Sequence, residues 1–100
     1  MAVEIGHYID GKRVAGGSGR TGDVTNPATG EVTGKVALAS VAEIDKAVQV
    51  ARKAQVAWAN TPPLRRQRVM FNLKGLMEKR LDDIAQLMTL EHGKTIDDAK

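Results

Sequence analysis

Apolar and polar residues change their spacing along this chain, with short alternating runs first and helical spacings afterwards. The run "GHYIDGKRV" (6–14) predicts two strands joined at Asp10-Gly11, because a type I′ turn needs positive φ at both central residues. The next run, "AGGSGRTG" (15–22), is rich in glycine and predicts a mobile surface loop.

The stretch "TNPATGEVTGKVALAS" (25–40) predicts a second hairpin and not a linker. Asn26 can cap a turn with its side chain, Pro27 pre-sets φ, and Gly30 suits a left-handed residue. Residues 31–38 then alternate in the period of a strand, with Val32, Gly34, Val36 and Leu38 on one face.

Helical spacing begins at Ser40, where Ser40 and Glu43 form a predicted capping box. We expect the following helix to bury an alanine-rich stripe and Trp58, and we expect Trp58 and the methionines to lie in the core. The stripe consists of Val41, Ile44, Ala47, Val48, Ala51, Ala54 and Trp58.

A second helix is predicted to follow Thr61-Pro62-Pro63, with Thr61 as its cap, and to run to about Lys79. Gly75 predicts a close packing contact, since glycine inside a helix costs about 1 kcal/mol relative to alanine. The predicted apolar face consists of Val69, Leu73, Leu76 and Met77.

A third helix is predicted over about 81–91, with Asp82-Asp83 in its first turn and His92-Gly93 as its stop. Its predicted buried stripe consists of Ile84, Leu87 and Met88. Thr95 then begins a fourth helix. Because the chain ends one turn later, we expect a sequence cut from a longer one.

Charge is distributed unevenly and weighs against a nucleic-acid face. The net charge is +3, but residues 62–80 carry six basic and one acidic group, whereas residues 81–100 carry two basic and five acidic groups. This favours complementary packing or surface patterning over a nucleic-acid face. There is no cysteine, no apolar run of membrane-spanning length and no signal-peptide pattern, so we expect a cytoplasmic protein without a membrane partner.

The residue types that carry chemistry lack the partners that a site requires. His7 and His92 have no metal-ligand spacing, so we expect an exposed strand residue and a cation at a helix end. Arg65, Arg66 and Arg68 do not form one stripe. We interpret them as a solvated face with ion pairs to neighbouring elements, such as the acidic start of the third helix, in preference to an anion site.

The acidic pairs and the glycines also have structural explanations. Neighbouring helical residues point about 100° apart, so neither Asp82-Asp83 nor Asp97-Asp98 converges for acid–base catalysis. The "GGSG" loop (16–19) lacks the ending of a phosphate loop and is not followed directly by a helix. We therefore predict no catalytic, cofactor-binding or metal-binding residue in this sequence.

The ordered set of motifs resembles the start of an aldehyde dehydrogenase. These motifs are "YIDGKRV" (8–14), "TNPATGEVTGKVALAS" (25–40), "AWANTPPLRRQRVMFNLKGLMEKR" (57–80) and "LMTLEHGKTIDDA" (87–99). Within that family, "HYIDGKRV" and "LEHGKTIDDAK" are most similar to the CoA-acylating methylmalonate-semialdehyde dehydrogenase branch. Lys94 and the arginines match the family pattern, and we assign them structural roles.

The resemblance implies an α/β enzyme whose leading part is present here as an α+β segment. Residues 1–39 would supply two hairpins and residues 40–100 three to four helices of the NAD-binding domain. The parent enzyme would use NAD and coenzyme A to convert methylmalonate or malonate semialdehyde to propanoyl-CoA or acetyl-CoA with loss of CO2. It would act in valine catabolism, through a cysteine thiolate, as a homo-oligomer (dimer or tetramer).

Two other interpretations remain open, beside the prediction that these 100 residues are inactive alone. The chain can belong to another aldehyde dehydrogenase, or it can be a free-standing interaction module without catalysis. A nucleic-acid binder is the least favoured. We also expect the segment to be marginally stable or prone to aggregation by itself, because its strands have open edges and its helices present apolar stripes.

Overall fold

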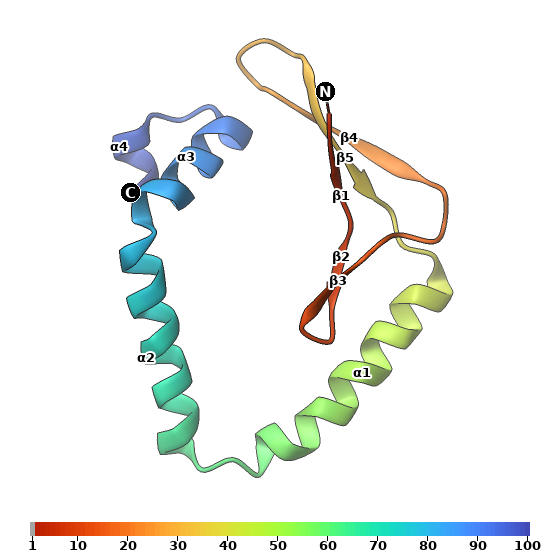
Figure 1. The fold of residues 1–100 in the computed structure, drawn as a ribbon, viewed down its shortest axis with the longest axis vertical. Helices are drawn as coiled ribbons and strands as arrows, with labels where there is room; N and C mark the ends of the chain where they lie inside the picture. The colour runs from red at the N-terminus through yellow and green to blue at the C-terminus, as the bar shows by residue number, and fades with distance from the viewer. Residues whose placement is uncertain (1) are drawn as a thin grey trace. The chain divides into compact units, whose positions relative to one another are not determined.

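A computed structural model describes residues 2–100 as five short strands followed by four helices (Figure 1). The strands are β1 (Val3–Ile5), β2 (His7–Ile9), β3 (Lys12–Val14), β4 (Thr21–Thr25) and β5 (Val32–Ala37). The helices are α1 (Val41–Ala59), α2 (Pro63–Lys79), α3 (Leu81–His92) and α4 (Ile96–Ala99). In this described part of the chain, no helix is long and apolar enough to cross a membrane.

The chain forms two compact units. The first, here the strand unit, comprises the residues up to Thr25 together with Val32–Ala59. The second, here the helical unit, comprises Asn26–Glu31 together with Asn60–Lys100. The α+β order of elements is the one that the sequence predicts.

The first predicted hairpin is confirmed as β2 and β3, which pair antiparallel with Tyr8 opposite Arg13. Asp10 and Gly11 have φ values of 56° and 72°, as a type I′ turn requires. The Tyr8 hydroxyl donates to the Gly11 carbonyl at 3.0 Å and so closes the turn from the side.

The second hairpin is also confirmed, but it belongs to a sheet of three strands in the order β1-β5-β4. Strand β4 pairs antiparallel with β5, and β1 pairs with β5 in parallel. The sequence prediction missed β1 because three residues carry little periodicity and their partner lies far along the chain. Gly34 permits the pairing, since a Cβ there would lie 3.1 Å from the Val3 carbonyl oxygen.

The turn between β4 and β5 follows the predicted chemistry. The Asn26 side-chain oxygen accepts from the Ala28 N–H at 2.9 Å, and the Gly30 N–H donates to the Asn26 carbonyl at 2.7 Å. Gly30 has a φ of 75°, which glycine adopts without steric cost. This turn, residues 26–31, groups with the helices and not with its own strands.

The first two helices begin in different ways. At the start of α1 the Ser40 N–H donates to the Glu43 carboxylate at 2.8 Å and the Glu43 N–H donates to the Ser40 hydroxyl at 3.2 Å, which confirms the capping box. At α2 the prediction of Thr61 as cap is wrong, because Pro62 takes the N-cap position. The Pro62 carbonyl accepts from the Arg65 and Arg66 N–H groups.

The third and fourth helices end and begin at the predicted residues. Gly93 terminates α3 with a φ of 82°, and its N–H donates to the Thr89 carbonyl. Thr95 caps α4, with its hydroxyl accepting from the Asp98 N–H at 3.2 Å. The Lys100 ammonium lies 2.6 Å from an Asp82 carboxylate oxygen and joins the C-terminal turn to the start of α3.

Burial is where prediction and structure differ most. Among residues 2–100, only Gly34 and Ala85 are buried. Trp58 is 44% exposed and Phe71 62%, so the prediction that Trp58 lies in a core is wrong for this chain. The methionines of α2 and α3 are exposed as well: Met70, Met77 and Met88.

The predicted apolar faces of α2 and α3 have the expected helical spacing but no cover within the described residues. All four residues of the predicted α2 face are exposed, as is Leu87 of α3. The buried position of α3 is Ala85, beside the predicted stripe. The prediction of a packing contact at Gly75 is also wrong here, since a Cβ at Gly75 would meet nothing within 4 Å.

Candidate functional site

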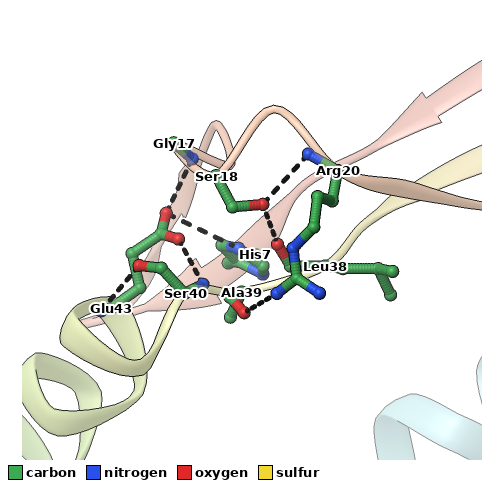
Figure 2. Close-up of polar contacts among 8 residues, drawn as sticks. All are labelled: His7, Gly17, Ser18, Arg20, Leu38, Ala39, Ser40 and Glu43. Carbon is green, nitrogen blue, oxygen red and sulfur yellow. Dashed lines mark hydrogen bonds and ion pairs between the residues drawn. The ribbon is translucent and has the colours of Figure 1, made fainter.

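The best-organised group of polar side chains centres on the Glu43 carboxylate, in the first turn of α1 (Figure 2). One carboxylate oxygen accepts from the Gly17 N–H at 2.7 Å, and the other accepts from the Ser40 N–H at 2.8 Å. Glu43 therefore joins the glycine-rich loop to the start of α1. The sequence predicts the bond to Ser40 but gives no signal for the bond to Gly17.

The glycine-rich loop is held by further hydrogen bonds, in contrast to the predicted mobile loop. The Ser18 hydroxyl donates to the Leu38 carbonyl and accepts from the Arg20 N–H. The Arg20 guanidinium donates to the Ala39 carbonyl at 3.0 Å. Figure 2 shows these bonds meeting around the segment that connects β5 to α1.

His7 lies beside this group, and the prediction of an exposed strand residue is wrong. Its side chain is 18% exposed, and Nε2 lies 3.9 Å from the nearer Glu43 carboxylate oxygen. Nε2 is buried and has no hydrogen-bond partner among the described residues. A Cβ at Gly16 would lie 3.4 Å from the same nitrogen, so strand β2, the loop and α1 all meet here.

The electrostatics of the group stabilise a charged Glu43. Hydrogen bonds from the Ser40 and Gly17 N–H groups lower the pKa of its carboxyl below the ordinary value of 4.5, and the nearby His7 lowers it slightly further. A carboxylate that accepts several hydrogen bonds is a poor proton acceptor at neutral pH. Glu43 therefore fits a structural anion better than a general base.

An open groove of about 470 Å³ adjoins the Glu43 group, between the β2–β3 hairpin and α1. Its lining is mainly apolar and includes Ile9, Ile44, Val48 and Ala51. Beyond His7 and Glu43, the lining of the groove has no pair of ionisable side chains that could act as a general acid and a general base. Such an open, mainly apolar groove is typical of a surface that packs against another element.

The candidate arginines do not converge on a ligand. Arg65 and Arg66 lie in the first turn of α2, and the Nε of Arg66 is buried without a hydrogen-bond partner within residues 2–100. The predicted ion pair with the acidic start of α3 does not form at Asp82, whose partner is Lys100. The pKa of that lysine is raised by the Asp82 carboxylate, which accepts its hydrogen bond and attracts its charge.

The other candidates lie at helix ends, as the sequence predicts. His92 is the last residue of α3, and the two aspartate pairs occupy the first turns of α3 and α4. Within residues 2–100, no three His, Asp or Glu side chains come close enough together to hold a metal ion. The chain contains no cysteine.

The glycine-rich loop does not fit the pyrophosphate of a dinucleotide. Such a site needs free N–H groups at the start of a helix. This loop leads into strand β4, as predicted, and its Gly17 N–H already donates to a carboxylate. A phosphate there would meet the negative charge of Glu43, so no step of NAD chemistry is assigned to these residues.

The chain is similar to known dehydrogenases over nearly all of its length. Residues 14–100 match the aldehyde dehydrogenase family. The malonate-semialdehyde dehydrogenase of Pseudomonas aeruginosa is 46% identical over 93 residues, which are 93% of this chain and 18% of that protein. The aldehyde dehydrogenase DhaS of Bacillus subtilis is 47% identical over 93 residues, which cover 91% of this chain and 19% of that protein.

A solved structure shows the same likeness. A protein assigned as methylmalonate-semialdehyde dehydrogenase from Sinorhizobium meliloti 1021, complexed with NAD, matches 99% of this chain and 20% of its own, with 54% identity and a TM-score of 0.96. The chain thus spans about a fifth of the length of these relatives. The fold is that of the N-terminal part of such an enzyme, and the chain belongs to the aldehyde dehydrogenase family.

Proposed function

We propose that these residues are part of an NAD- and CoA-dependent semialdehyde dehydrogenase of the acylating type. Its substrate is methylmalonate or malonate semialdehyde, and its product is propanoyl-CoA or acetyl-CoA, with loss of CO2. The observation that carries this proposal is the likeness, over more than nine tenths of the chain, to semialdehyde dehydrogenases. In such an enzyme NAD accepts the hydride and coenzyme A accepts the acyl group.

The role that we assign to this segment is structural. Its described residues bury almost nothing of their own, while apolar side chains line α1, α2 and α3. Burying such a side chain contributes about 1.5–3 kcal/mol. The remaining four fifths of a relative's length would supply that cover, together with the nucleophile and the residues that bind the two cofactors.

Inactivity of residues 1–100 alone follows from this role. The acylating reaction needs a thiolate to attack the aldehyde carbonyl, and this sequence has no cysteine. The structural assignment of Lys94, Arg65, Arg66 and Arg68, a cytoplasmic location, and assembly as a homo-oligomer remain parts of the proposal.

The test is an assay of the protein at its full natural length. Malonate semialdehyde, NAD+ and coenzyme A should yield NADH and acetyl-CoA in equal amounts, whereas residues 1–100 alone should yield neither. Turnover by the isolated segment would contradict the structural role. NADH formation that proceeds without coenzyme A, with release of a free acid, would contradict the acylating type.

The second candidate is an aldehyde dehydrogenase of different specificity. The observation that favours it is the 47% identity to DhaS, which is close to the 46% identity to the malonate-semialdehyde dehydrogenase of Pseudomonas aeruginosa over the same number of residues. The two candidates therefore differ little in these sequence identities. A panel of simple aldehydes in the same assay separates them, because a non-acylating enzyme forms carboxylic acid whether or not coenzyme A is present.

A further inference from the structure

We propose that Glu43 is a three-way latch that holds the glycine-rich loop and strand β2 against the first turn of α1. This is a conformational device in addition to helix capping. Its carboxylate is the common partner of all three segments, so the order of residues 16–17 depends on this one side chain, distant in sequence, while Ser18 and Arg20 hold the rest of the loop.

The hydrogen bonds divide into a local and a long-range set. The exchange with Ser40 spans three residues and closes the first helical turn. The bond from the Gly17 N–H spans 26 residues and contributes nothing to the helix itself. A carboxylate acceptor gives a stronger bond than a neutral one, so the long-range bond depends on the charge of Glu43.

Close packing at the loop is an independent observation in favour of the latch. A Cβ at Gly17 would lie 3.3 Å from the Glu43 carboxylate oxygen, and a Cβ at Gly16 would lie 2.5 Å from the Ala37 Cβ. The loop backbone therefore sits directly on α1 and on β5, and glycine is required for that approach. A loop that did not pack against α1 and β5 would not need glycine at both of these positions.

Among the ionisable side chains around Glu43, that of His7 faces its carboxylate from β2 at 3.9 Å. Asp10, Lys12 and Lys46 line the adjoining cavity of about 280 Å³ together with both residues. Two lysines, one on the hairpin and one on α1, thus share this cavity with Glu43, and the loop itself binds Glu43 through the Gly17 N–H.

Hydrogen–deuterium exchange with mass spectrometry, on the protein at its full natural length and at neutral pH, tests the latch. Glu43→Gln keeps the shape and removes the charge, and peptides covering residues 15–20 should exchange roughly tenfold faster. Ser40→Ala removes the hydroxyl that accepts from the Glu43 N–H but leaves the Glu43 carboxylate and its bond from the residue-40 N–H, so it should affect the start of α1 more than the loop. Glu78→Gln, which removes an exposed carboxylate of α2, should leave the loop unchanged.

Equal loop exchange in wild type and Glu43→Gln would overturn the latch, as would equal effects of Glu43→Gln and Ser40→Ala on the loop. Should Glu43→Gln fail to fold, a cycle with Gly17→Ala and Glu43→Ala decides. Gly17→Ala should speed loop exchange in wild type, where its Cβ meets the carboxylate, and much less in Glu43→Ala. Independent effects of the two substitutions would contradict the proposal.

Discussion

The strand unit and the helical unit use opposite means to order a chain with almost no core. In the strand unit, contacts join segments that lie far apart in sequence: β1 with β5, and Glu43 with Gly17. In the helical unit, the helix ends are ordered by neighbours along the chain, such as the left-handed Gly93 and the Thr95 cap. Among its described residues, long-range order is limited to the turn 26–31 and the Lys100–Asp82 ion pair. The strand unit is therefore the more sensitive to a single change, since each long-range contact orders two segments at once.

The largest expected effect is at Gly16, in the strand unit. Gly16→Ala places a Cβ 2.5 Å from that of Ala37, which forces a shift of the loop or of β5. Overpacking of this kind costs about 1–3 kcal/mol. Amide exchange of the β4–β5 ladder in the full-length protein measures it. Unchanged protection of that ladder would remove the distinction drawn between the two units.

A smaller loss is expected at the cap of α1. Ser40→Ala removes the acceptor of the Glu43 N–H and should destabilise the start of α1 by about 1 kcal/mol. The matched change in the helical unit is Thr95→Ala, which removes the acceptor of the Asp98 N–H. Because α4 has four residues, we expect fraying confined to that turn. Hydrogen exchange of the peptides that cover the starts of α1 and α4 measures and compares the two effects.

The opposite sign is expected at Gly75, in the helical unit. Gly75→Ala meets open space and raises helix propensity, so a peptide of residues 60–80 should gain about 0.5–1 kcal/mol of helix stability. Circular dichroism of the peptide measures this. The same change in the full-length protein sharpens the comparison, because a loss of stability there would identify a neighbour of Gly75 outside residues 2–100.

The two units also respond to pH, at opposite ends of the scale. Because the folded pKa of Glu43 is lowered, its contribution is present above pH 4.5 and is lost as pH falls through the folded value. Because the folded pKa of Lys100 is raised, its contribution is present below pH 10.5 and is lost as pH rises through the folded value.

Exchange differences between wild type and Glu43→Gln, and between wild type and Asp82→Asn, test these two windows. The first difference should vanish in acid and the second in alkali. A Glu43→Gln difference that persists at a pH well below the carboxyl range would show that its charge is not involved.

Local signals predicted most of the elements. The Asp10-Gly11 turn, the Ser40–Glu43 capping box and the Gly93 stop each depend on residues within one turn of each other, so a single sequence displays them. The features that the sequence does not predict depend instead on contacts between distant segments. Strand β1, the bond from Gly17 to Glu43 and the position of His7 depend on chain segments brought together by folding, and no local pattern encodes the partner.

The burial predictions failed for a different physical reason. The helical stripes are apolar, as predicted. An apolar stripe indicates that this face of the helix packs against something, but it does not indicate which part of the protein packs there. Trp58 and Leu87 remain 44% and 62% exposed because the described residues supply only part of that packing. The prediction that no site residue lies in this sequence stays a prediction.

The central claim is that these residues obtain their order from the remainder of a larger aldehyde dehydrogenase. Scanning calorimetry of the isolated residues 1–100, with sedimentation to establish the oligomeric state, tests it most directly. We predict no cooperative heat absorption, because the apolar faces of α1, α2 and α3 lack cover in this segment. A sharp, reversible, cooperative transition in a monomer would contradict the account.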